Sequence, residues 1–210
     1  MGVNVANYER IKAELVTATL VAVSKTKPVE DIQALYDLGQ RDFGENYVQE
    51  LADKQAVLPK DIRWHFIGHL QSNKVKYIAP FAQMIHGVDS FKLLKEIDKQ
   101  ALKSGRVIDC LLQIHIAKEE TKFGMDETEL EEVKSQLDEL KNVHVRGLMG
   151  MASFSDDLSL VRNEFANLYS LFKRTGPWDV LSMGMSGDYK IAVEEGSTMV
   201  RIGSLLFGAR

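Results

Sequence analysis

The sequence predicts a closed barrel of eight parallel strands, a (β/α)8 or TIM barrel, with an extra N-terminal helix. Two observations predict this fold: short apolar runs alternate with amphipathic stretches along all 210 residues, and the eight runs are evenly spaced. A doubly wound open sheet also alternates strands and helices, but it seldom needs eight strands at such even spacing. No linker, low-complexity tract or repeat divides the chain, so we expect one domain over residues 1–210.

The first half of the chain predicts four strands behind the N-terminal helix. One helical face of the N-terminal segment is apolar, formed by Val5, Tyr8, Ile11 and Leu15. The four strands are expected at 20–25, 41–45, 63–68 and 84–89, and the helices between them at 29–39, 46–58 and 72–81. Pro28 suits the first turn of the helix that follows the first strand, and Gly39 suits its end.

The second half repeats the pattern, with clear helix start signals. Ser90 is a typical N-cap, and Gly105 ends the helix that it begins. Asp126 and Glu129 have the spacing of a capping box ahead of a stripe that runs to Leu140. The four strands are expected at 107–116, 143–151, 179–184 and 199–203, and the later helices at 161–175 and 186–196.

Composition excludes several classes of protein. The net charge is −4 with basic residues spread along the chain, which disfavours nucleic-acid binding, and no apolar stretch reaches the roughly 20 residues of a membrane span. The one cysteine, Cys110, lies in the apolar run VIDCLLQIHI and is interpreted as strand packing. A lone thiol fits a reducing, cytoplasmic setting.

Lys25 stands at the end of the first strand, where a barrel carries its active face. Strand parity places Val21, Val23 and Lys25 on one face, so an inward-facing Lys25 would sit above an apolar ring. A desolvated amine there has a lowered pKa, as Schiff-base chemistry with an aldehyde requires. The alternative is a strand-end lysine that reaches solvent. Lys27 lies two residues later and is expected to be a solvated loop lysine.

The loops after the seventh and eighth strands suggest a phosphate site. In barrels of this kind phosphate binds at these loops, and here SMGMSGDY and MVRIGS place Ser186 with Gly187 and Gly203 with Ser204 at the starts of two helices. Simple turn formation is the alternative. Arg201 lies between apolar neighbours and is expected to face inward toward an acceptor on a ligand, or to pair with Glu194 or Glu195.

The sequence gives no support for a metal site. His65 and His69 have a spacing that suits zinc on a helix, but here it spans a strand and a loop. We therefore predict no metal ligand.

A resemblance to the pyridoxal phosphate homeostasis protein family rests on six segments: AVSKTKP, FGENYVQE, WHFIGHLQSNK, GLMGMASF, LSMGMSGDY and EEGSTMVRIGSLLFGAR. It runs from about Leu20 to Arg210 and implies a barrel similar to the N-terminal domain of bacterial alanine racemase. The resemblance implies that Lys25 forms the internal aldimine with pyridoxal 5′-phosphate (PLP). The other residues that it implies in cofactor binding are Asn46, His65, Met183, Ser186, Arg201, Gly203 and Ser204, with Lys122 near the phenolic oxygen.

The resemblance also implies a role in PLP and amino-acid homeostasis without efficient catalysis. An arginine opposite the pyridine nitrogen disfavours its protonation and weakens the cofactor as an electron sink. Racemases of this fold add a tyrosine from a C-terminal domain, and this sequence ends at the barrel, so we expect a monomer with no catalytic residue. PLP-dependent apoenzymes are candidate partners. The alternatives are a PLP-dependent enzyme, such as an amino-acid racemase, and a barrel enzyme whose Lys25 binds a sugar phosphate.

Overall fold

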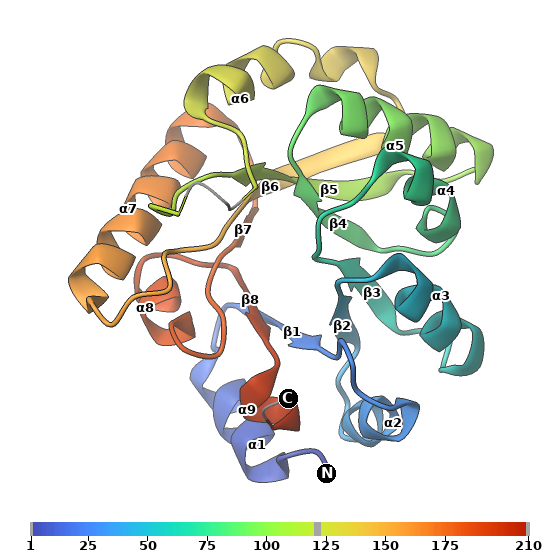
Figure 1. Ribbon diagram of the computed structural model, residues 1–210, viewed down its shortest axis with the longest axis vertical. Coiled ribbons are helices and arrows are strands. Elements are labelled where there is room, and N and C mark those ends of the chain that lie inside the picture. The colour runs from blue at the N-terminus through green and yellow to red at the C-terminus, as the bar shows by residue number, and fades with distance from the viewer. Residues whose placement is uncertain (1, 120–122, 209–210) are drawn as a thin grey trace.

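Eight parallel strands close into a barrel in the computed structural model, which describes residues 2–119 and 123–208 (Figure 1). Each strand pairs with the next along the chain, and β8 pairs with β1. The strands are β1 Thr19–Val23, β2 Asp42–Glu45, β3 Arg63–Phe66, β4 Met84–Val88, β5 Ile108–Ile114, β6 Val143–Gly150, β7 Val180–Ser182 and β8 Met199–Ile202. The predicted barrel is therefore confirmed, with all eight strands within a few residues of their expected positions.

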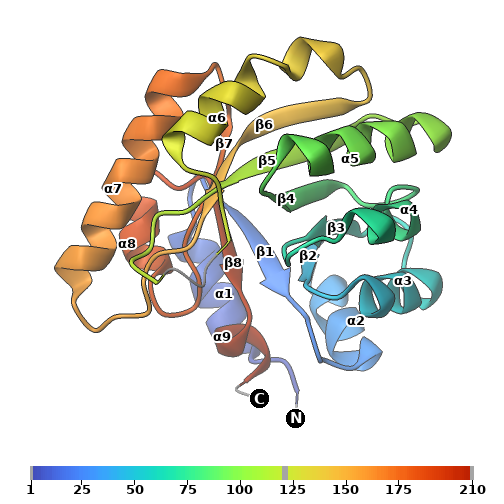
Figure 2. The same cartoon turned by 45° about the horizontal axis from the view of Figure 1, so that its top comes forward.

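Helices surround the barrel on its outside, as Figures 1 and 2 show. The α-helices are α1 Val5–Glu14, α2 Val29–Asp37, α3 Val48–Val57, α4 Val75–Ile78, α5 Phe91–Lys103, α6 Glu127–Lys134, α7 Leu158–Thr175, α8 Tyr189–Glu194 and α9 Ser204–Phe207. Two 3-10 turns, η1 Ser72–Lys74 and η2 Leu137–Glu139, complete the described elements. No helix in the described part of the chain is long and apolar enough to span a membrane.

The predicted helix starts are confirmed at α5 and α6. The Ser90 hydroxyl accepts a hydrogen bond from the Leu93 amide, and Asp126 and Glu129 form a reciprocal capping box. The stripe after Asp126 is not one helix, however, because α6 ends at Lys134 and η2 follows as a separate turn.

The last predicted helix begins three residues later than expected. The Asp188 carboxylate accepts from the Met185 amide at 2.5 Å, and the Tyr189 amide donates to the Met185 carbonyl at 2.9 Å. These bonds fold residues 185–188 into a turn, so α8 starts at Tyr189. Ser186 therefore lies in a loop and not at a helix start, whereas Ser204 does begin α9.

Apolar residues of the strands belong to two separate clusters. The smaller cluster lies inside the barrel and consists of Val21, Met84, Leu111, Met149, Val180 and Met199. Leu20 and Ala22 belong to the larger cluster between strands and helices, together with the fully buried Cys110. The predicted parity of the first strand is thus confirmed, since Val21 faces inward and its neighbours face outward.

Helix α1 packs beside α9, which brings the two ends of the described chain together (Figures 1 and 2). The Asn4 amide donates to the Leu206 carbonyl at 2.8 Å. Tyr8 and Ile11 are buried as predicted, but Val5 is 47% exposed, so its assignment to the buried face was wrong. Val5 is the first residue of α1, and its side chain is left on the exposed side of the helix.

Candidate functional site

Lys25 lies in a tight, strained turn directly after β1. The Lys27 amide donates to the Ser24 carbonyl at 3.0 Å, and Thr26 between them has a φ of 64°. This left-handed conformation costs a β-branched residue about 1–3 kcal/mol. Strain of this kind persists where the surrounding structure holds it, and it often marks a functional site.

A cavity of about 390 Å³ opens at the carboxyl ends of the strands, and Lys25 lines it. Its described lining comes from β1 and β8 and from the segments that follow β1, β2, β3, β6, β7 and β8. The residues are Val23, Lys25, Lys27, Asn46, Ile67, Met151, Phe154, Met185, Ser186, Gly187, Arg201, Gly203, Ser204 and Gly208. Three of these side chains are cationic and none is a carboxylate. The cavity therefore suits an anionic ligand of the size that small-molecule sites hold.

Six of the eight predicted site residues meet at this cavity: Lys25, Asn46, Ser186, Arg201, Gly203 and Ser204. The structure does not bring the other two to it. His65 is 2% exposed and lies inside the barrel, where it binds a carboxylate from β2. Met183 is fully buried in the cluster between strands and helices. Lys122 lies outside the described residues.

The loops after β7 and β8 meet at one side of the cavity. The Gly203 amide donates to Ser186 Oγ at 3.3 Å, and the Arg201 amide donates to the Gly184 carbonyl at 2.9 Å. Gly184 has a φ of 95°, and a Cβ there would lie 2.6 Å from the Ala192 Cβ. Only glycine allows this close approach of the loop to α8. The two loops thus place hydroxyl and amide groups beside each other, as the sequence predicts.

Arg201 is 4% exposed and points inward from β8. Its two terminal nitrogens donate to Ser182 Oγ at 2.6 Å and to the Gly150 carbonyl at 3.0 Å. Burial lowers the pKa of Arg201 to about 10, so the guanidinium is still cationic at neutral pH. The alternative pairing with Glu194 or Glu195 is wrong, because both carboxylates bind Arg162 on the protein surface.

Two other lining residues have informative contacts. Lys27 Nζ donates to the Phe207 carbonyl at 3.0 Å and the Gly208 carbonyl at 3.3 Å, so it ties the Lys25 turn to α9 and is not a solvated loop lysine. The Asn46 Oδ1 atom is buried and has no hydrogen-bond partner among the described residues. A ligand in the cavity could satisfy this oxygen, which costs free energy while it stays unpaired.

A buried ionic network on the outer side of β1 holds the Lys25 turn, and the sequence did not reveal it. Lys54 Nζ donates at 2.7 Å to each of three acceptors: the Ser24 carbonyl, Glu45 Oε1 and Glu50 Oε1. The Ser24 hydroxyl also donates to Glu45, and the Thr26 amide donates to Glu50. The backbone on both sides of Lys25 is therefore fixed to α3.

A signal for the network was present in the sequence. Lys54 lies on the buried stripe of α3, between Leu51 and Leu58, where an apolar residue is expected. A charged residue in a buried stripe requires partners of opposite charge nearby.

Comparison with known proteins relates the whole described barrel to one family. Residues 5–210 match the alanine racemase N-terminal domain family. Two relatives, each named pyridoxal phosphate homeostasis protein, come from Aquifex aeolicus and Pasteurella multocida and are 43% and 42% identical to this chain. The alignments cover 92% and 91% of this chain, and 87% and 86% of the relatives.

Solved structures agree with these relationships. PipY of Synechococcus elongatus, solved with PLP bound, is 37% identical with a TM-score of 0.89, over 97% of this chain and 99% of PipY. Alanine racemase from Bartonella henselae, solved with covalently bound pyridoxal phosphate, is 18% identical with a TM-score of 0.78. It aligns over 96% of this chain and 57% of the racemase, so it shows a shared fold alone.

Proposed function

The chain belongs to the pyridoxal phosphate homeostasis protein family, and we propose that it binds PLP in the cavity around Lys25. We propose further that it takes part in PLP and amino-acid homeostasis as a carrier or regulator. One observation carries the proposal: the described lining of the cavity combines a strand-end lysine, a buried arginine and two hydroxyl-bearing loops, without a carboxylate. A phosphorylated aldehyde needs this set of groups.

The described residues fit the cofactor. When bound, PLP would supply an aldehyde for a lysine amine and a phosphate for hydroxyl and amide donors. Lys25 would provide the amine, and Ser186, Gly203 and Ser204 would hold the phosphate at the loops after β7 and β8. The Asn46 side chain would contact the cofactor ring. Its buried Oδ1, which has no hydrogen-bond partner among the described residues, could then accept a hydrogen bond at the ligand.

The charge of Arg201 favours a protein that holds the cofactor over one that uses it in catalysis. Since its pKa is about 10, Arg201 is a cation at neutral pH, and a cation facing a pyridine nitrogen disfavours protonation of that nitrogen. The described lining also has no tyrosine, histidine or carboxylate that could act as a second acid or base beside the lysines. We therefore favour a carrier or regulator over an enzyme. We propose separately that the protein is a cytoplasmic monomer and that PLP-dependent apoenzymes are its partners.

The absorption spectrum of the purified protein tests the proposal. The wild-type protein should show the near-ultraviolet to visible band of protein-bound PLP, and borohydride reduction should fix the cofactor on Lys25. Lys25→Ala should lose both signals. Lys27→Ala is the matched control, since it removes a second lysine from the same cavity and should keep the covalent adduct. A band and adduct that persist in Lys25→Ala would refute the assignment.

Two further measurements separate the alternative functions. A racemase would exchange the α-hydrogen of a preferred amino acid with deuterated solvent, so sustained exchange on any common amino acid would favour an enzyme. An enzyme acting on a sugar phosphate would be colourless, and borohydride would trap an adduct only when substrate is present.

A further inference from the structure

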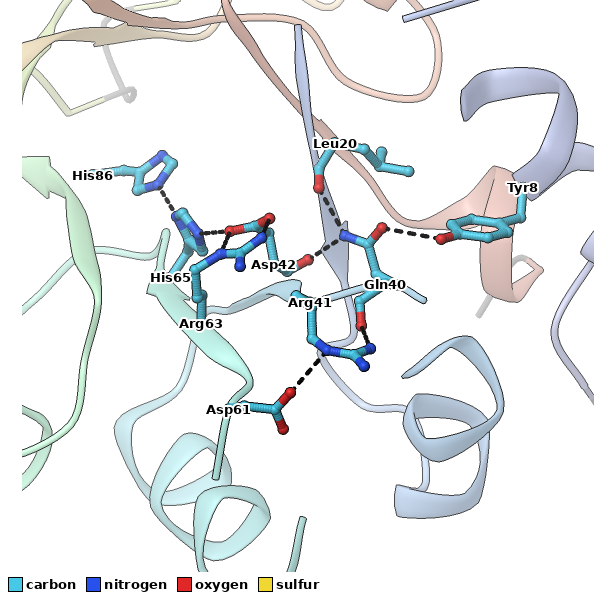
Figure 3. Close-up of polar contacts among 9 residues, drawn as sticks. All are labelled: Tyr8, Leu20, Gln40, Arg41, Asp42, Asp61, Arg63, His65 and His86. Carbon is cyan, nitrogen blue, oxygen red and sulfur yellow. Dashed lines mark hydrogen bonds and ion pairs between the residues drawn. The ribbon is translucent and has the colours of Figure 1, made fainter. Parts of the chain in front are cut away.

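Five polar side chains from five strands form a continuous hydrogen-bonded row inside the barrel. Asp42 Oδ1 lies 3.0 Å from His65 Nε2, and His65 Nδ1 lies 2.9 Å from His86 Nε2. His86 Nδ1 lies 3.1 Å from Ser182 Oγ, which accepts from Arg201 at 2.6 Å. All five residues are at most 9% exposed. Figure 3 shows the row from His86 through His65 to Asp42.

The outer end of the row is anchored by Arg63 at the amino-terminal side of β3. Its guanidinium donates to both oxygens of Asp42, at 2.8 and 2.5 Å (Figure 3). Burial opposes ionisation of Asp42, but hydrogen bonds from Arg63 and His65 outweigh it and lower the pKa of Asp42 to about 2. Asp42 is therefore a carboxylate at neutral pH, and the row has an anion at one end and the Arg201 cation at the other.

The two charged ends fix the direction of the hydrogen bonds next to them. Arg201 has only donors, so Ser182 accepts from it and directs its own O–H to His86 Nδ1. Asp42 has only acceptors, so His65 donates to it through Nε2–H. With one proton on each imidazole, His65 Nδ1 accepts from His86 Nε2–H. In this arrangement both imidazoles carry their proton on Nε2, and all donors point from Arg201 toward Asp42.

The surroundings of His86 support this neutral form. Its ring is fully buried, and burial, with a smaller contribution from the charge of Arg201, lowers its pKa well below the usual value. A neutral His86 bonded on both sides cannot rotate without breaking two buried hydrogen bonds. Ser182 is thereby held in the orientation in which it accepts from Arg201.

We propose that Ser182, His86, His65 and Asp42 are positioning residues. Their hydrogen-bonded row, in which all donors point the same way, fixes the Arg201 guanidinium at the cavity. Arg201 contacts the ligand, and the other four act through it. The orientation of Arg201 toward PLP rests on the proposed function, whereas the direction of the chain does not. The sequence could have indicated the row, because parity puts His86 and Ser182 on the inward face of their strands, as it does Lys25.

The first test needs no ligand. In ¹⁵N-labelled protein at neutral pH, the imidazole nitrogen shifts of His65 and His86 should both report the neutral Nε2–H tautomer. An Nδ1–H tautomer or a doubly protonated ring at either position would overturn the proposed direction. The guanidinium of Arg201 should also give separate terminal nitrogen resonances, because its hydrogen bonds restrict rotation.

Ser182→Ala tests whether the hydrogen-bonded row holds the Arg201 guanidinium in place. Removing this hydroxyl should merge the terminal nitrogen resonances of Arg201 and weaken PLP binding about tenfold, as expected for a hydrogen bond to a charged group. Ser182→Thr restores the hydroxyl and should recover both readouts. Ser197→Ala is the matched control, because Ser197 is equally buried but its hydroxyl bonds to backbone carbonyls, among them that of Met183.

The outcomes separate this inference from the proposed function. If Ser182→Ala leaves Arg201 and PLP affinity unchanged, or if Ser197→Ala causes an equal loss, the positioning role is wrong although PLP binding stands. If the wild-type protein does not bind PLP, the proposed function fails, and the nitrogen resonances of the ligand-free protein still decide whether the chain orients Arg201.

Discussion

Replacing Lys54 with methionine should destabilise the protein and loosen the turn that carries Lys25. Lys54 is 6% exposed and is the positive centre between Glu45, which is fully buried, and Glu50. Methionine keeps most of the side-chain volume but removes the charge and three hydrogen bonds. Glu45 then becomes a buried carboxylate without its counter-ion.

The size of the effect follows from the burial of Glu45. Removing one partner of a buried ion pair costs about 3–5 kcal/mol, because the remaining charge is uncompensated. Burial already raises the pKa of Glu45, with attraction to Lys54 opposing that rise, so the variant should raise it further. An acid with a raised folded-state pKa loses stability as pH rises between its unfolded and folded pKa values. The deficit should therefore be largest at alkaline pH.

Urea unfolding from pH 5 to pH 8 measures this deficit. At pH 8 the free energy of unfolding of Lys54→Met should be about 3–5 kcal/mol below wild type. At pH 5 a protonated Glu45 removes the charge penalty, and a deficit of about 1–2 kcal/mol from the lost hydrogen bonds should remain. Lys60→Met is the control, since Lys60 is exposed and bonds only to backbone carbonyls. It should change stability by less than about 0.5 kcal/mol.

Two results would refute this reasoning. A deficit below about 1 kcal/mol at pH 8 would mean that solvent or a rearranged side chain compensates Glu45. A deficit that grows as the pH falls would mean that the lost interaction does not stabilise an ionised carboxylate, so it would not be the pairing of Lys54 with Glu45.

Three further predictions concern backbone and core. Gly147→Ala should abolish soluble folded protein or lower its thermal midpoint strongly, because a Cβ there would lie 1.9 Å from the Val180 carbonyl oxygen. Thr26→Gly should raise the free energy of unfolding by up to about 1 kcal/mol in urea melts, because it relieves the left-handed strain at an exposed position; a loss of stability would contradict the strain. Cys110 should not react with an aromatic disulfide reagent until denaturant is added, because burial raises the pKa of its thiol; rapid native-state labelling would contradict this.

The sequence predicted the fold well because a barrel repeats one local rule eight times. Each short apolar run is too short for a helix and too evenly spaced for an open sheet, so errors in single boundaries do not change the topology. The failures are local and concern tertiary contacts. The turn at Asp188 delays α8, and Val5 at the start of α1 is exposed although it belongs to the apolar stripe of that helix.

A site residue could be predicted only where strand parity or a family motif indicated its position. Parity placed Lys25 on the inward face, but nothing near Arg201 in the sequence indicates that its partner is Ser182 and not Glu194. That choice depends on Arg162, which lies on α7 and reaches Glu194 across the protein surface. Contacts between elements far apart in sequence follow from the closed barrel and could not be read from one strand.

Lys25 and Arg201, two of the three cations that line the cavity, are held from opposite sides of the sheet. At the end of β1, successive side chains point to opposite faces of the sheet. Ser24 therefore points outward to the Lys54 network, and Lys25 points inward to the cavity. Arg201 is held instead from inside the barrel, by side chains at positions that branched apolar residues usually fill in such barrels. Buried polar chains are seldom more stabilising than well-packed apolar side chains. Their presence at both cations is therefore better explained by the geometry of a ligand site than by the stability of the barrel.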